Sequence, residues 1–456
     1  MRLRNYFVIS LLILILAAPS FGSQQRAKLP QSAYLKSAKI SMLGNPPRYE
    51  EALQFLDTML FYYGPIPEGF LFRGNIYAEY ANKESDLSKK LGFFEKMAEN
   101  YDSMASACGN KEIKSGLRND CKKFSGVTDS IRTFYWRETY NSGVQAIDTV
   151  NEFAKKISGA ADSAEILTLK EQMKMTADSG RLFFQIAATV DPSRYRSFEG
   201  IGLLYDRLKQ YDSSLVWLKK ASAIVPDTAY LIQNIAYSYI QMDDWDNAIA
   251  YFKKYLEKVP NDANTCFNIA ICYSNKRQYD SAYVWDLKTI AADTTISGAY
   301  TDAGQYFLVR SQAVYDSVRN TTDKAKAEQF GKLRDTYLDS SAYYLKTAHR
   351  LEPDNGQILE QLAVVLFARA NFTDALEAFK KLTELEPNRK EYWISVGDIY
   401  IQLQKFKEAI PPYEKATELD PGDIKLWEVL KDLYTNNNMP DKAKAAEAKI
   451  ADLQKM

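Results

Sequence analysis

The side chains most often used in catalysis and metal binding are scarce in this chain. Its 456 residues include one histidine, His349, and four cysteines. A structural zinc site needs about four Cys, His or carboxylate ligands, and the chain has neither a second histidine nor a Cys-x-x-Cys spacing. His349 stands near the end of a predicted helix, where a positive charge on its ring would interact favourably with the helix dipole. The sequence therefore predicts no metal site.

Motifs for phosphate binding and nucleophilic catalysis do not occur either. The chain has no glycine-rich phosphate loop and no Gly-x-Ser-x-Gly sequence. Carboxylates are abundant, but stretches such as TELEPNRKE (383–391) place them on solvated helix faces. General acid–base catalysis needs two carboxylates that converge in a dry cleft. We therefore expect a non-catalytic protein without a cofactor.

Composition and charge restrict the class of partner. Hydrophobic residues make up 46% of the chain and charged residues 25%, which is typical of folded rather than disordered proteins. The 58 basic residues balance the 58 acidic ones. A near-neutral chain has no electrostatic footprint for nucleic acid, so we expect no nucleic-acid partner.

The amino end has the pattern of a secretory signal peptide. Two arginines precede an apolar run from Phe7 to Ala18, and small residues suit cleavage before Ser23. The run has 12 residues, too few for a membrane span of about 20. No later segment is long and apolar enough to span a bilayer. We expect export of a chain without a membrane span, to a bacterial periplasm in preference to an extracellular space.

The four cysteines form two groups. Cys108 and Cys121 lie 13 residues apart in a stretch typical of a loop, where a disulfide could close; the sequence leaves open whether it does. Cys266 and Cys272 are six residues apart on one predicted helix, which puts them on different sides. We expect the second group to be buried thiols rather than a bridge.

Prolines mark a regular repeat in the chain. Six of them form two series with a spacing of 34 residues: Pro192, Pro226 and Pro260, then Pro353, Pro387 and Pro421. A fixed period of this length indicates stacked supersecondary units. Because proline lacks an N–H and disfavours helix in the residue before it, each proline separates one helical hairpin from the next.

Other positions of the period also share a side-chain type. The tenth residue after the proline is small: Gly202, Ala236, Ala270, Ala363 and Gly397. The twenty-second is small as well, and the twenty-sixth is bulky, for example Leu218, Phe252, Phe379 and Tyr413. A spacing of four residues between small and bulky side chains is the period of a helix. Each unit is therefore predicted to be a helix, a short turn and a second helix.

Three stretches, DNAIAYFKKYLEKVPND, TDALEAFKKLTELEPNR and KEAIPPYEKATELDPGD, strongly resemble the second half of the tetratricopeptide repeat. The resemblance covers most of the chain. It implies an all-α, right-handed superhelical solenoid of about ten antiparallel helical hairpins, two of them extended. Pro411 and Pro412 fall inside a predicted second helix, where we expect a late start or a kink.

The repeat pattern divides the chain into seven predicted segments. They are a signal peptide at 1–22, amino-terminal hairpins at 23–106, a cysteine-containing loop at 107–126, an extended hairpin at 127–191, three repeats at 192–294, a second extended hairpin at 295–352, and three repeats with a polar cap at 353–456.

In this family the first helices of the hairpins line a concave groove that holds peptide partners. The resemblance puts ten residues of the two central repeats there: Tyr230, Gln233, Tyr237, Ile240, Gln241, Asn264, Phe267, Ile271, Ser274 and Asn275. Aromatic rings mixed with amides favour an extended or helical segment with apolar anchors. The alternative for Tyr237, Phe267 and Ile271 is that they pack against an adjacent helix.

Family members that grip a terminal carboxylate use a lysine from these first helices. The corresponding positions here are occupied by Glu199, Gln233, Phe267, Glu360 and Ile394. This departure argues against a carboxylate clamp.

We expect an exported scaffold that binds a partner protein or peptide segment within an envelope or extracellular assembly. Two alternatives remain open. One is a self-assembling structural component, which would form homo-oligomers. The other is a glycan-binding or enzyme accessory protein, with sugars stacking on rings such as Trp136, Trp217, Trp245 and Trp285.

Overall fold

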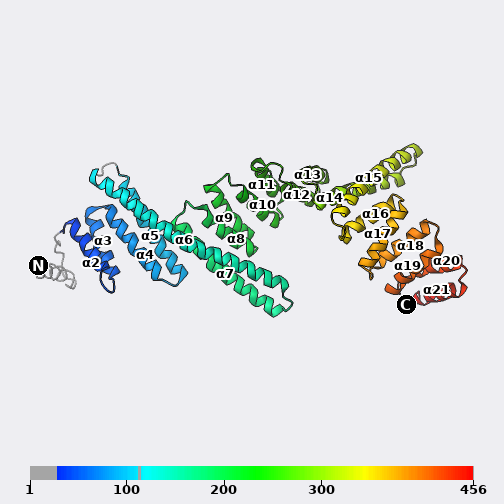
Figure 1. The fold of residues 1–456 in the computed structure, drawn as a ribbon, viewed down its shortest axis with the longest axis horizontal. Coiled ribbons are helices and arrows are strands. Elements are labelled where there is room, and N and C mark those ends of the chain that lie inside the picture. The colour runs from blue at the N-terminus through cyan, green and yellow to red at the C-terminus, as the bar shows by residue number, and fades with distance from the viewer. Residues whose placement is uncertain (1–27, 111–114, 455–456) are drawn as a thin grey trace. The chain divides into compact units, whose positions relative to one another are not determined.

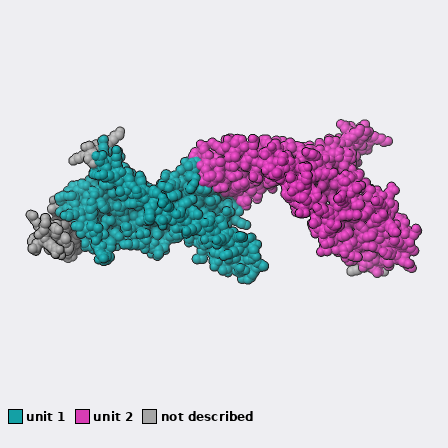
Figure 2. All heavy atoms as spheres, in the orientation of Figure 1, with its two compact units in different colours: residues 1–225 teal, residues 226–456 magenta. Residues whose placement is uncertain are grey.

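A computed structural model describes residues 28–110 and 115–454, and these residues form twenty helices and no strands (Figure 1). The predicted signal peptide, residues 1–22, lies outside the described residues. The chain divides into two compact units, residues 1–225 and residues 226–456 (Figure 2). Consecutive helices pair into ten hairpins, two of them extended, so the predicted all-α solenoid of about ten hairpins is confirmed.

The first unit contains four hairpins. Their helices are α2 (Gln31–Met42) with α3 (Tyr49–Tyr63), α4 (Pro67–Lys83) with α5 (Leu87–Cys108), α6 (Ser115–Gly159) with α7 (Ser163–Val190), and α8 (Tyr195–Arg207) with α9 (Tyr211–Ile224). The hairpin of α6 and α7 is the extended one, with helices of 45 and 28 residues.

The second unit contains six hairpins. Their helices are α10 (Ala229–Gln241) with α11 (Trp245–Lys258), α12 (Ala263–Asn275) with α13 (Tyr279–Ala292), α14 (Ser297–Asn320) with α15 (Lys324–Leu351), α16 (Gly356–Ala368) with α17 (Phe372–Leu385), α18 (Lys390–Gln402) with α19 (Phe406–Leu419), and α20 (Ile424–Asn436) with α21 (Pro440–Leu453). Here α14 and α15 form the extended hairpin, with 24 and 28 residues.

In several hairpins a small residue of the first helix faces a bulky residue of the second helix. A methyl group added at Gly202 would lie 2.8 Å from Cγ of Leu218, and one added at Gly397 would lie 2.5 Å from the ring of Tyr413. These pairs are the tenth and twenty-sixth positions of the repeat. The two helices therefore approach closely only where the first one has almost no side chain.

The turns between the helices repeat the same geometry. The seventeenth residue after each proline has a left-handed backbone, with φ between 57° and 62°: Lys209, Asp243, Arg277, Ala370, Gln404 and Asn438. The next residue donates its N–H to the carbonyl of the thirteenth, as Asp244 does to Tyr239 at 3.0 Å. This closing bond ends the first helix and sets the start of the second.

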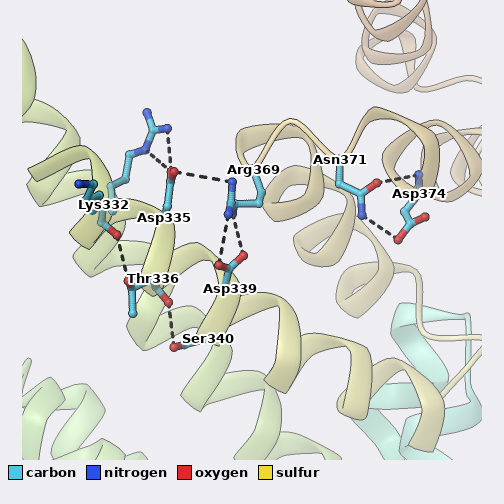
Figure 3. A network of polar contacts seen from close by, with 9 residues as sticks. Lys332, Asp335, Thr336, Asp339, Ser340, Arg369, Asn371 and Asp374 are labelled. Carbon is cyan, nitrogen blue, oxygen red and sulfur yellow. Dashed lines mark hydrogen bonds and ion pairs between the residues drawn. The ribbon is translucent and has the colours of Figure 1, made fainter. Parts of the chain in front are cut away.

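The extended hairpin of α14 and α15 is tied to the repeat that follows it by a polar network (Figure 3). Arg369, at the end of α16, donates from Nε to Asp339 of α15 at 2.7 Å and pairs with Asp335 at 3.6 Å. Asn371 then caps α17 by accepting from the backbone N–H of Asp374. The charges lie at the protein surface, so they fix orientation more than they add stability.

Two local predictions are wrong. The cysteine-containing stretch is not a loop from 107 to 126, because α6 already begins at Ser115. Cys121, Phe124, Thr128 and Ile131 recur at the helical period and are buried or half-buried, and Phe124 and Ile131 pack against the core that contains α5. The periodicity is difficult to recognise in the sequence because glycines and charged residues lie between these positions.

For the helix that contains Pro411 and Pro412 we expected a late start or a kink, and the late start does not occur. Helix α19 begins at Phe406, at the same repeat position as the other second helices, and runs through both prolines. The two missing N–H groups would have bonded to the carbonyls of Lys407 and Glu408. Both of these residues are exposed, so water can satisfy the free carbonyls.

One core position of the repeat holds an ionisable residue. Asp286 of α13 is the twenty-sixth residue after Pro260, where four of the other regular repeats have Leu218, Phe252, Phe379 and Tyr413, and it is 1% exposed with no partner for Oδ1. Burial, and secondarily the carboxylate of Asp302 in α14, raises the pKa of Asp286 to about 8. Burial likewise raises the pKa of Asp302 to about 6. The contact between α13 and α14 is therefore weaker when these groups are ionised.

We predict that Asp286→Leu stabilises the protein, and more so at high pH. Folded Asp286 keeps its proton at pH values where the unfolded chain has lost it, so its contribution is full below about pH 4 and is lost as the pH rises through about 8. We expect a gain of about 1–3 kcal/mol at pH 9 and a smaller gain at pH 5, measured by thermal unfolding. Asp286→Asn, which removes only the charge, should flatten the pH dependence. An unchanged pH profile in both variants would contradict the burial of an unpaired carboxyl.

Candidate functional site

The ten residues predicted to face a partner all lie on α10 and α12, in the second unit. Within each helix they recur at spacings that place them on one face. None of them is buried: Tyr230, Tyr237, Gln241, Asn264 and Asn275 are exposed, and Gln233, Ile240, Phe267, Ile271 and Ser274 are half-buried. We refer to these ten residues as the α10–α12 surface.

Tyr237 is an aromatic residue of α10 that contacts α12. Its hydroxyl accepts a hydrogen bond from Nδ2 of Asn268 at 3.2 Å, and its ring meets that of Phe252 edge-on at 5.4 Å between centroids. The side chain is thus held by α11 and α12 while 39% of it stays exposed. A ring fixed in this way loses little conformational entropy when a partner covers it.

The ring of Phe267 is held in place by α14, in the next hairpin. It lies against Gly298 in the first turn of α14, where an added methyl group would be 2.5 Å from Cζ. The alternative, that these side chains pack against an adjacent helix, therefore holds for one face of each ring, because the rings of Tyr237 and Phe267 contact neighbouring helices. Their outer faces remain at the surface, since neither residue is fully buried.

The α10–α12 surface also lacks charge. Neither α10 nor α12 contains Asp, Glu, Lys, Arg or His. Its polar groups are carboxamides and hydroxyls, which stay neutral at physiological pH. The surface can therefore hold a partner through apolar contact and neutral hydrogen bonds.

His349 occupies the last turn of α15, as predicted, but its surroundings disfavour the positive charge that would interact with the helix dipole. The side chain is half-buried and its Nδ1 atom is buried without a partner. Burial, followed by the nearby Lys381, lowers its pKa below the ordinary value. The charged form of the ring is therefore disfavoured. Within residues 28–110 and 115–454, no cluster of three or more His, Cys, Asp or Glu side chains could hold a metal ion.

The cysteines and tryptophans take part in packing. Cys108 and Cys121 are joined by a disulfide, and Cys266 and Cys272 are buried free thiols, as expected for the second group. Three of the four tryptophans considered for sugar stacking contact other side chains: Trp136 stacks on Tyr140, Trp217 stacks on Phe198, and Trp285 lies under Lys288. Trp245 is the first residue of α11.

Sequence families identify the repeat. Two family models described as tetratricopeptide repeat match this chain, one over residues 337–424 and one over residues 232–262. The chain contains tetratricopeptide repeats. The second match includes most of α10, and proteins of this family in general mediate protein–protein interactions. None of the helices in the described part of the chain is long and apolar enough to cross a membrane.

Solved structures of other tetratricopeptide-repeat proteins are similar to parts of the chain. YrrB, described as having an unusual peptide-binding site, is 21% identical over 44% of this chain and 92% of its own, with a TM-score of 0.36. The C-terminal part of a protein from Cytophaga hutchinsonii is 19% identical over 55% and 93%, with a TM-score of 0.41. A protein from Parabacteroides merdae is 13% identical over 64% and 99%, with a TM-score of 0.33. No curated protein sequence matches the chain.

We predict that Gly298→Ala destabilises the protein by about 1–2 kcal/mol, because the new methyl group displaces the ring of Phe267. Gly331→Ala in α15 is the matched control, since nothing lies within 4 Å of the added methyl group. That control should gain up to about 1 kcal/mol from helix propensity. Thermal unfolding measures both. Equal gains in the two variants would show that Phe267 does not rest on α14.

Proposed function

We propose that the protein is an exported, non-catalytic scaffold that holds a segment of a partner protein on the α10–α12 surface. The observation that carries this proposal is the state of Tyr237 and Phe267, whose rings are fixed by neighbouring helices and still partly exposed. Neighbouring Ile240 and Ile271 are half-buried and add apolar area. Apolar anchors fixed in advance are typical of the centre of a protein interface.

Two observations support export. The first 22 residues have the pattern of a signal peptide. The disulfide between Cys108 and Cys121 suits an oxidising compartment, because thiols in the cytosol are kept reduced. Small extracellular domains have many disulfides for their length, whereas this long chain has one in its described residues. We therefore place the protein in a periplasm rather than outside the cell.

Self-association is a second candidate, favoured by the extended hairpin of the first unit. Leu167 and Met175 of α7 are 60% and 70% exposed, and they lie eight residues apart, on the same side of the helix. A second copy of the chain could cover them. This function would appear as concentration-dependent mass in light scattering, lost in Leu167→Ser plus Met175→Ser and unaffected by changes on α10 and α12.

We predict that Tyr237→Glu plus Phe267→Glu abolishes partner capture. The protein from Ser23 onward serves as bait for an envelope extract of the source organism, and captured proteins are identified by mass spectrometry. Two buried carboxylates at the interface centre should weaken binding by at least about a hundredfold.

The matched control for this experiment is Val284→Glu plus Tyr343→Glu, which adds the same charges at exposed apolar residues of α13 and α15. This control variant should capture the same proteins as the unaltered protein. Helicity and melting of both variants are compared to exclude unfolding. If the same proteins bind all three forms, the α10–α12 surface is not the binding site.

A further inference from the structure

The absence of charge on α10 and α12 restricts what can bind there. Each helix has 13 residues, and none is charged, in a chain whose charged fraction is 25%. The other short first helices of the described chain differ. Helix α8 contains Arg196, Glu199, Asp206 and Arg207, and α18 contains Lys390, Glu391 and Asp398. The uncharged surface is therefore a local property of these two repeats.

Carboxamides take the place of the charges. The two helices contain six of them: Gln233, Asn234, Gln241, Asn264, Asn268 and Asn275. Asn268 donates to Tyr237, and Asn275 donates to the carbonyl of Ile271 at 3.0 Å. The two helices thus fix some of these amides in place. Each carboxamide has a donor and an acceptor, which are the groups that a peptide backbone also presents.

An extended backbone matches such a surface better than a helical one. In an extended segment the N–H and C=O groups are available to a binding surface. In a helix they are already bonded to one another, except at its ends. The carboxamides therefore favour an extended occupant, while Tyr237, Phe267 and the two isoleucines favour apolar or aromatic side chains in it.

A charged side chain would be disfavoured on this surface. Covering it with the partner would remove water from the charge, and no opposite charge on α10 or α12 would compensate. From these observations, and resting on the proposed function, we propose that the occupant of the α10–α12 surface is an extended, uncharged peptide segment with apolar or aromatic side chains.

A library of random dodecapeptides displayed on phage tests this inference. It is selected on the protein from Ser23 onward, and peptides that also bind Tyr237→Glu plus Phe267→Glu are removed. The remaining peptides should be poor in Asp, Glu, Lys and Arg. The Kd of a synthetic copy should change less than about twofold between 50 and 500 mM NaCl, because there is no charge pair to screen.

The second part of the test uses substitutions that add charge with little change in side-chain shape. Gln233→Glu plus Asn264→Asp adds two negative charges and keeps the side-chain shapes, so the fold is preserved. The uncharged peptide should bind this variant about tenfold more weakly, and selection on it should enrich Lys and Arg. Gln357→Glu plus Gln402→Glu, at exposed residues of α16 and α18, is the matched control and should leave the Kd unchanged.

The outcomes separate this inference from the proposed function. Selected peptides that are charged, with binding that falls steeply in salt, would overturn the inference and leave the binding surface in place. Enrichment of charged peptides by both the unaltered protein and the isosteric variant would also overturn the inference and leave the binding surface in place. Failure to enrich any peptide that depends on Tyr237 and Phe267 would contradict the proposed function, and the inference with it.

Discussion

The structure depends on one contact that recurs along the chain: a small residue of a first helix against a bulky residue of the second. Gly202 with Leu218 and Gly397 with Tyr413 show it most directly, because a methyl group added at either glycine would force the facing side chain to shift. The contact uses the inner side of each hairpin. The opposite side of the first helix is then left to contact neighbouring repeats or a partner, which is why α10 and α12 can have exposed aromatic rings without loss of the core.

The same constraint explains the exceptions. Where the bulky residue is replaced by Asp286, an ionisable group lies in the core, and the contact between α13 and α14 depends on its protonation. Where prolines enter α19, the bulky position is still Tyr413, so the helix keeps its register and places the lost hydrogen bonds at exposed residues. The extended hairpins lengthen both helices and keep the small-to-bulky contact, as Gly304 and Leu345 show.

The sequence predicts the fold well because the repeat supplies the same evidence several times. The approximate number of hairpins, the proline boundaries of the regular repeats and the buried thiols of α12 all follow from periodicity. The start of α6 could not be predicted, since only Cys121, Phe124, Thr128 and Ile131 reveal its period, among glycines and charges. For the site, sequence spacing gives the residues that face outward. It does not show that Asn268 and Gly298 hold Tyr237 and Phe267 in place, because those contacts join different repeats.

The central claim is that a partner lies against the outward faces of α10 and α12. Site-specific photocrosslinking in cells of the source organism tests it most directly. A photoreactive phenylalanine analogue is placed at Gln233 or Asn264, and at Val284 on α13 for comparison. Our account predicts a crosslink to the same protein from the first two positions and none from the third. A crosslink from Val284 alone, or no crosslink from α10 and α12, would contradict it.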